Sequence, residues 1–140
     1  MWLIGHAFLF LSQLVESSAY RSTQNTRRIR DFYIKEALTF IEANFQRDIT
    51  IEEIAEVCGL NRSYLTRLFK ETTGYSLQEY LGIYRMKIAA KMLAESNLPV
   101  QAIASKVGYG DAFTFAKAFK RHTGKSPTEY RSSGGSITVD

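Results

Sequence analysis

One segment of the chain occurs twice, and this duplication limits the fold more than any other feature of the sequence. Ile54-Ala55 and Gly59 in the first copy match Ile103-Ala104 and Gly108, which lie 49 residues later. Beyond the glycines the offset becomes 50, where Phe69-Lys70 matches Phe119-Lys120, Thr73-Gly74 matches Thr123-Gly124, Ser76 matches Ser126, and Glu79-Tyr80 matches Glu129-Tyr130. A repeat with this many ordered matches indicates one supersecondary unit that is built twice.

Each copy has the pattern of a helix, a tight turn and a second helix. Apolar residues recur at helical spacing on both sides of a glycine, which tolerates the left-handed conformation of a tight turn. In the first copy these are Ile51, Ile54, Ala55 and Cys58 before Gly59, then Leu65, Leu68 and Phe69; in the second they are Val100, Ile103, Ala104 and Val107 before Gly108, then Phe115, Ala118 and Phe119. The sequence therefore predicts two helix-turn-helix units, over about residues 50–74 and 99–124.

Capping boxes predict where three helices begin. Thr50–Glu53, Ser76–Glu79 and Ser126–Glu129 each place Ser or Thr three residues before Glu, the arrangement typical of a helix N-terminus. The second box opens a linking helix over residues 77–95, which would span roughly 28 Å. Successive turns of a DNA major groove lie about 34 Å apart, so such a helix can hold two units near one DNA turn apart. No segment alternates convincingly as a strand does, and we expect an all-α fold.

The first thirty residues differ from the repeat. Residues 1–16 are apolar on two adjacent helical faces, which predicts a separate N-terminal helix that is buried or covered by a partner. Residues 17–30 are polar and have the composition of a linker. Asp31 is then the expected N-cap of a domain over residues 31–131, and residues 132–140 are expected to form a flexible tail.

The excess of positive charge lies in the helical part of the chain. The net charge is +4, and residues 26–131 contain 17 basic and 12 acidic residues. A basic helical domain favours a polyanionic partner, although a solvated surface explains the same balance equally well. A single cysteine cannot form an internal disulfide, and no uninterrupted apolar run is long enough to predict a membrane span.

The sequence predicts no catalytic, metal or cofactor site. His6 and His122 lie far apart, in different expected elements, and Cys58 falls on the apolar face of a helix. Neither metal-ligand spacing nor a phosphate-binding glycine motif is present in the sequence. We therefore expect that the protein is not an enzyme.

Three segments resemble a known family: IEEIAEVCGLNRSYLTRLFKETTG, YRMKIAAKMLAESN and VQAIASKVGYGDAFTFAKAFKRHTGKSPTEYR. Through them, residues 31–131 resemble the C-terminal DNA-binding domain of AraC/XylS-type bacterial transcription regulators. The resemblance implies a cytoplasmic transcription regulator that inserts two recognition helices into successive major grooves of double-stranded DNA. Activators are among the regulators of this family. RNA polymerase is a candidate partner. Phe113-Thr114-Phe115 stands where family members often have Ser-Tyr-Phe, so the bases recognised there are expected to differ.

The second helix of each unit is expected to place its N-terminal half against base edges. The outward residues expected at DNA are Arg62, Ser63, Thr66 and Arg67 in the first unit and Ala112, Phe113, Ala116 and Lys117 in the second. By resemblance, Ser63, Thr66 and Arg67 occupy base-reading positions, whereas Arg62 could reach a base or a phosphate. Arginine can bind guanine with two hydrogen bonds, and alanine or phenylalanine can contact the thymine methyl group.

Structural roles compete with DNA contact at two of these positions, Arg67 and Phe113, and a structural role is also expected for Arg85 of the linking helix. Arg67 could instead form a surface ion pair with Glu71, four residues later on the same helix. Phe113 could pack inward, which is as well supported by the sequence as contact with a thymine methyl. Arg85 matches a recurrent arginine of the family's linking helix, and we expect it to form a structural ion pair rather than a base contact.

Family members carry a large N-terminal effector-binding or dimerisation domain, but only about 25 residues precede the DNA-binding domain here. We therefore expect a fragment in which residues 1–16 are the last helix of a missing domain. Those residues could form a homodimer contact with a second chain, or dock against their own DNA-binding domain. The alternative function is a helical protein-interaction module, whose basic face binds an acidic protein.

Overall fold

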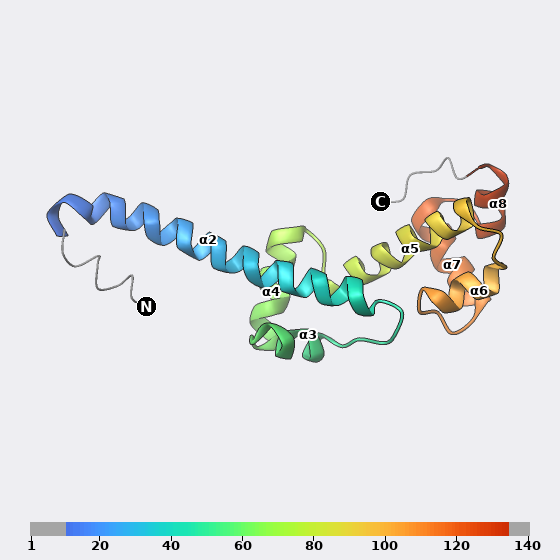
Figure 1. The fold of residues 1–140 in the computed structure, drawn as a ribbon, viewed down its shortest axis with the longest axis horizontal. Coiled ribbons are helices and arrows are strands. Elements are labelled where there is room, and N and C mark those ends of the chain that lie inside the picture. Colours follow the sequence, from blue (N-terminus) through green and yellow to red (C-terminus); the bar gives the residue numbers. More distant parts are fainter. Residues whose placement is uncertain (1–10, 135–140) are drawn as a thin grey trace.

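The computed structural model describes residues 11–134 of the chain. Within these residues every regular secondary-structure element is a helix, without a β-strand, so the all-α fold class is confirmed. The helices are α2 (Leu11–Asn44), α3 (Ile51–Cys58), α4 (Arg62–Thr73), α5 (Leu77–Glu95), α6 (Val100–Lys106), α7 (Ala112–Thr123) and α8 (Pro127–Ser132). Figure 1 shows an elongated arrangement, in which α5 leads from the α3 and α4 region to the group formed by α6, α7 and α8.

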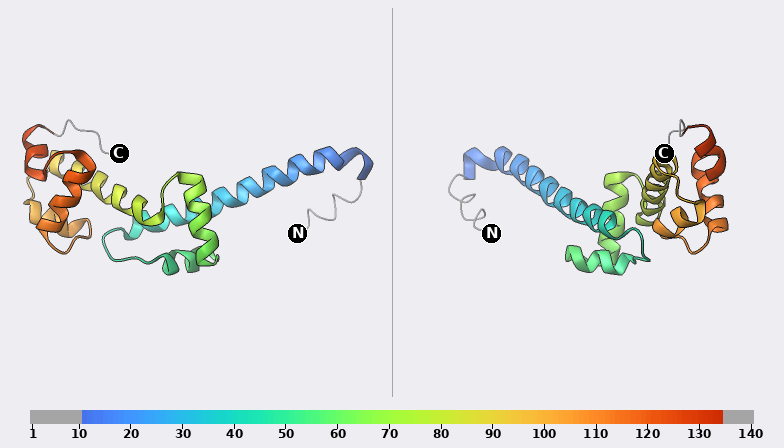
Figure 2. Two further views of the ribbon diagram at one scale, coloured as in Figure 1. Left: turned by 180° about the vertical axis from the view of Figure 1, so that it is seen from behind. Right: turned by 45° about the vertical axis from the view of Figure 1, so that its right-hand side comes forward.

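Two separate hydrophobic clusters stabilise the two ends of this arrangement. The first unit consists of the C-terminal half of α2, α3, α4 and the start of α5, around buried residues that include Ile41, Ile54, Leu65, Phe69 and Leu77. The second unit consists of the rest of α5, α6, α7 and α8, around buried residues that include Met86, Leu93, Ile103, Phe115, Phe119 and Tyr130. The first unit packs on the C-terminal half of α2 and the second unit packs on α5. Because the start of α5 also packs in the first unit, α5 belongs to both units (Figure 2).

The three predicted capping boxes are present. At the start of α3, the Glu53 amide donates to Thr50 Oγ1 at 3.1 Å and the Thr50 amide donates to Glu53 Oε1 at 3.0 Å. Equivalent reciprocal bonds of 2.8 to 3.1 Å open α5 at Ser76 and α8 at Ser126. Both partners of each capping box lie within three residues of each other, so a short sequence segment is enough to predict these hydrogen bonds.

The turns inside the two units depend on glycine. Gly59 ends α3 in the left-handed conformation, with φ of 73°. Its amide and that of Leu60 donate to Glu56 and Ala55 carbonyls at the end of α3. Gly108 has φ of 97° in the second unit. L-residues with a Cβ rarely adopt this region, so both turns require the residue type that the sequence supplies.

The expected linker, residues 17–30, is helical, and its role as a linker stays a prediction. Residues 17–30 lie within α2, so the helix continues through Asp31, which is not an N-cap. Residues 11–16 belong to the same helix rather than to a separate one, while residues 1–10 lie outside the described residues. The segment has no apolar stripe, but it also has no glycine or proline, so nothing in it stops a helix that the packed C-terminal half already stabilises.

Only the C-terminal half of α2 is packed against other helices. Ile34, Ala37 and Ile41 are buried against α3 and α4, at helical spacing along one face. Arg30 forms an ion pair with Glu71 of α4, with Nη2 2.8 Å from Oε1. The N-terminal part of α2 projects away from both units (Figure 1). The polar sequence of residues 17–30 is suited to an exposed helix, because it has no apolar face that needs to be buried.

Candidate nucleic-acid interface

Helix α4 presents one buried face and one exposed face. Asn61 is its N-cap and accepts a hydrogen bond from the Tyr64 amide at 2.8 Å. Leu65, Leu68 and Phe69 are buried in the first unit. The four residues predicted to contact DNA, Arg62, Ser63, Thr66 and Arg67, are all exposed. They follow from Asn61 over the first half of the helix, so the fold brings them together on one outward surface.

The Arg67 side chain lies over an aromatic ring. Its guanidinium carbon is 5.6 Å from the centroid of the Tyr64 ring, three residues earlier on the same helix. The alternative of an ion pair with Glu71 is not realised, because Glu71 is bound by Arg30 of α2. A cation–π contact is weak at an exposed site, so it restrains the guanidinium while leaving its donors available.

Arg62 is already engaged with an acidic neighbour. Its Nη1 atom is 3.0 Å from Oε2 of Glu52 in α3, and both side chains are 63% exposed. Exposed pairs of this kind contribute little to stability. A DNA phosphate or base that binds Arg62 would therefore displace Glu52 at small cost.

Helix α7 repeats the arrangement of α4 in the second unit. Asp111 is its N-cap and accepts hydrogen bonds from the Thr114 amide at 2.7 Å and from the Thr114 hydroxyl at 3.0 Å. These two hydrogen bonds, the backbone one foremost, hold the pKa of the Asp111 carboxyl below its ordinary value of 3.8. Phe115, Ala118 and Phe119 are buried, which orients the opposite face of α7 outward.

Phe113 projects into solvent, so the alternative of inward packing is wrong. It is 73% exposed, more than any other exposed large hydrophobic residue among those that the structure describes. Lys117 is also exposed, and its Nζ atom lies 5.0 Å from the centroid of the Phe113 ring. Ala112 and Ala116 are half-buried beside them. The outer surface of α7 is therefore more apolar than that of α4, with one cation above an exposed ring.

The eight predicted residues form four equivalent pairs. At the offset of 50, Arg62 matches Ala112, Ser63 matches Phe113, Thr66 matches Ala116, and Arg67 matches Lys117. In both helices a cation lies over an aromatic side chain of its own helix. The four pairs thus occupy equivalent helix positions, while the aromatic partners of the two cations lie at different positions and the two surfaces differ in polarity.

Arg85 has a structural position, but the expected ion pair is wrong. The guanidinium donates to two backbone carbonyls, from Nε to Phe45 O at 2.9 Å and from Nη2 to Arg47 O at 3.0 Å. Carbonyls left unpaired after the end of a helix are good acceptors for an arginine fork. The sequence could not identify these partners, because they lie about forty residues away and are backbone atoms.

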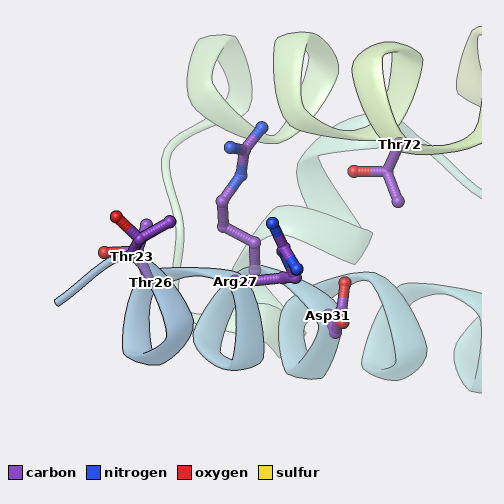
Figure 3. Close-up of a pocket in the computed structure, with 6 residues that line it drawn as sticks. Thr23, Thr26, Arg27, Asp31 and Thr72 are labelled. Carbon is purple, nitrogen blue, oxygen red and sulfur yellow. The ribbon is translucent and has the colours of Figure 1, made fainter. Parts of the chain in front are cut away.

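A polar pocket of about 420 Å³ lies where α2 passes the end of α4. Figure 3 shows Thr23, Thr26, Arg27 and Asp31 on α2, with Thr72 facing them from α4. Arg30, the sixth lining residue, is paired with Glu71. Because Asp31 and Glu71 balance the two arginines, the pocket offers no net charge for an anion. Within the described residues, no group of three His, Cys, Asp or Glu side chains is placed to hold a metal ion.

Two residues near the predicted surface were missed by the sequence analysis. Tyr64 restrains Arg67, and Glu52 pairs with Arg62. The Tyr64 contact has a local signal, since an aromatic residue three positions before an arginine on one helix brings the two side chains together. The Glu52 contact depends on how α3 and α4 cross, which no local pattern specifies.

None of the helices in the described part of the chain is both long and apolar enough to cross a membrane.

Comparison with known proteins agrees with this geometry. A family model described as a helix-turn-helix domain matches residues 54–133, which is more than half of the chain. The chain is 43% identical over 99 residues to the raffinose operon transcriptional regulatory protein RafR of Pediococcus pentosaceus, covering 71% of this chain and 36% of that protein. The chain spans less than half the length of the curated relatives it matches first.

Solved structures share the fold. The C-terminal domain of AraT, a response regulator from Geobacillus stearothermophilus, is similar with a TM-score of 0.69 and 35% identity, over 72% of this chain and 84% of that one. The DNA-binding domain of the transcriptional factor AdpA, solved in complex with a target DNA, has a TM-score of 0.68 over 71% of this chain and 90% of that one. At 23% identity, the AdpA likeness concerns the fold alone.

Proposed function

Because the chain belongs to the AraC/XylS-type helix-turn-helix family, we propose that it is a transcription regulator that binds double-stranded DNA in a sequence-specific manner. Helices α4 and α7 are the two recognition helices, and each enters one of two successive major grooves. The proposal locates the protein in the bacterial cytoplasm, where its DNA target lies. It includes no catalytic step.

One observation carries the proposal: the outward residues of α4 and α7 occupy equivalent positions in two copies of one unit. In the first unit Arg62, Ser63, Thr66 and Arg67 provide hydrogen-bond donors, which suits direct recognition of base edges. In the second unit Ala112, Phe113, Ala116 and Lys117 provide apolar contact and one cation. A half-site rich in A·T pairs fits the second surface, because thymine presents a methyl group in the major groove.

Regulation by the whole protein is a proposal drawn from its relatives. RafR is named for the regulation of an operon, and a relative from Staphylococcus xylosus is named a lactose operon transcription activator. On this basis we propose RNA polymerase as the protein partner at a promoter.

Homodimer formation through residues 1–16 also stays a prediction, and sedimentation of this chain against one that starts near Thr26 tests it. Equal monomeric masses would contradict dimer formation.

Selection of bound sequences from a random duplex pool tests the function directly. We expect two short half-sites about 10 base pairs apart, one for each recognition helix. Affinity for the selected duplex should then fall linearly with salt concentration on logarithmic axes, because lysine and arginine release counterions from phosphates. The double variant Arg67→Ala/Lys117→Ala serves as the control that should lose the preference.

Binding that is equally strong to all sequences would overturn the proposal. It would favour the alternative, in which the same helices form a protein-interaction module and the basic face binds an acidic protein. Titration with an acidic peptide in place of the duplex separates the two functions, since a regulator of this class should not bind the peptide tightly.

A further inference from the structure

The two units meet around one side chain in the middle of α5, that of Arg85. Its guanidinium donates to the carbonyls of Phe45 and Arg47, which follow the end of α2 in the first unit. The same guanidinium carbon lies 5.7 Å from the centroid of the Tyr109 ring, in the turn of the second unit. One planar group therefore contacts a chain segment from each unit.

Close packing at Gly108 makes this junction tight. A Cβ added to Gly108 would lie 3.0 Å from the Arg85 guanidinium carbon and 3.0 Å from the Phe45 carbonyl oxygen. Glycine at this turn is thus needed both for its φ of 97° and for the space that Arg85 occupies. The turn of the second unit cannot move toward the first without displacing the guanidinium.

Phe45 anchors the same segment from its other side. Its side chain is 7% exposed and belongs to the hydrophobic cluster of the second unit, although the residue follows α2 directly. Its ring makes an edge contact with Tyr84, with centroids 5.1 Å apart. The segment after α2 is therefore bound to the second unit by its ring and to α5 by its carbonyls.

We propose that Arg85 is a positioning residue that fixes the angle between α4 and α7, and so sets the half-site spacing that the protein accepts. The inference rests on the proposed function, because half-sites exist only if both helices bind DNA. The planar fork of arginine can hold two carbonyls and stack on a ring at once, which a lysine ammonium cannot do. The contacts of Arg85 thus connect the segment after α2 with the turn of the second unit.

Arg131 provides a matched control. Its Nε atom donates to Leu93 O at 3.1 Å and its Nη2 atom donates to Ser96 O at 3.2 Å, so it ties the end of α5 as Arg85 ties the end of α2. All three residues belong to the second unit. Replacing Arg131 removes the same chemistry without affecting the junction between the units.

The first experiment measures binding of the full chain to the selected duplex, to each half-site alone, and to duplexes with added base pairs between the half-sites. For Arg85→Met we expect an affinity loss of about tenfold on the selected duplex, in the range of ordinary coupling between two sites. Binding to single half-sites should change less than about twofold, and the preference for one spacing should flatten. Arg131→Met should keep that preference. Unchanged spacing preference in Arg85→Met, or an equal loss on half-sites, overturns the inference.

The second experiment needs no DNA, so it separates failure of this inference from failure of the proposed function. Spin labels at Thr66→Cys and Lys117→Cys, in a Cys58→Ser background, report the distance between α4 and α7. We expect one narrow distance distribution that broadens in Arg85→Met and in Arg85→Lys, the second of which guards against a misfolded first variant. An unbroadened distribution overturns the inference whether or not the protein binds DNA.

Discussion

Arg67 and Lys117 illustrate how the recognition surfaces are prepared at the scale of single residues. Each long cation lies over an aromatic side chain of its own helix, at 5.6 Å for Arg67 and 5.0 Å for Lys117. Flexible side chains lose conformational entropy when they bind, and a contact that limits their freedom beforehand reduces this loss. The positions of both residues follow from the repeat, and the sequence predicts them as outward. Their aromatic partners differ in spacing, which is why the repeat does not predict them.

Arg67→Ala tests base recognition at this scale. We expect a loss of about 1–3 kcal/mol in binding free energy at one base position, with relaxed specificity there. The measurement is a titration against duplexes that each carry one altered base pair. Lys70→Ala, which removes another cation of α4, one that lies 3.8 Å from Glu79 of α5, is the control that should leave the sequence preference intact. A loss that is equal on every duplex would instead assign Arg67 to a phosphate.

At the scale of elements, local patterns predict the helices of the repeat well. The capping boxes at Thr50, Ser76 and Ser126 specify three helix starts, because every partner lies within three residues. The same reasoning fails for residues 17–30, where helix formation depends on packing further along the chain. It also fails for Arg85, whose acceptors are distant backbone atoms. Contacts between residues about forty positions apart cannot be predicted from the pattern of a short sequence segment.

Gly59→Val tests the turn between α3 and α4. With φ of 73° at this position, a β-branched residue should reduce the free energy of unfolding by about 1–3 kcal/mol through backbone strain. No atom lies within 4 Å of an added Cβ, so the Cβ itself meets no clash. Thermal unfolding measures the loss. Gly110→Ala, where the added carbon also meets open space and φ is not positive, is the matched control, and equal stability of the two variants would contradict the assignment.

The capping boxes also predict how stability depends on pH. Backbone hydrogen bonds from Thr50, Ser76 and Ser126 are the main cause that lowers the pKa of Glu53, Glu79 and Glu129 below the ordinary value of 4.5. Near that pH the unfolded chain therefore binds more protons than the folded chain, so stability rises with pH. The contribution is complete above pH 4.5 and is lost as the pH falls through the lower folded values.

Unfolding temperatures between pH 6 and pH 3 measure this effect. The triple variant Glu53→Gln/Glu79→Gln/Glu129→Gln keeps side chains that can close a capping box but cannot titrate. We expect its unfolding temperature to decline less with acidification than that of the unaltered chain. Parallel curves for the two proteins would show that these carboxylates do not contribute.

At the scale of the whole molecule, the two units are independent in their cores and joined along α5. The hydrophobic clusters share no buried residue, and α4 and α7 belong to different clusters. Changes to one recognition surface should therefore leave the other unaltered. The sequence predicts this division from the repeat, but the position of Phe45 in the second cluster could not be predicted, because the residue precedes the first copy of the repeat.

Arg67→Ala and Lys117→Ala together test this independence. We expect the binding free energy lost by the double variant to equal the combined losses of the single variants to within about 0.5 kcal/mol. Fluorescence anisotropy on the selected duplex measures all three. A discrepancy well beyond that margin would mean that the two surfaces act on each other, and Arg131→Ala, paired with Arg67→Ala in the same way, controls for changes in overall stability.

The unbroken course of α2 has a mechanical consequence. A helix of 34 residues transmits rotation about its own axis, so a twist applied near Leu11 reaches the first unit as a twist rather than being absorbed by a flexible joint. Each residue inserted into the projecting part turns everything before it by about 100° and shifts it by about 1.5 Å. The number of residues in α2 therefore fixes the rotation of one end of the helix relative to the other about the helix axis.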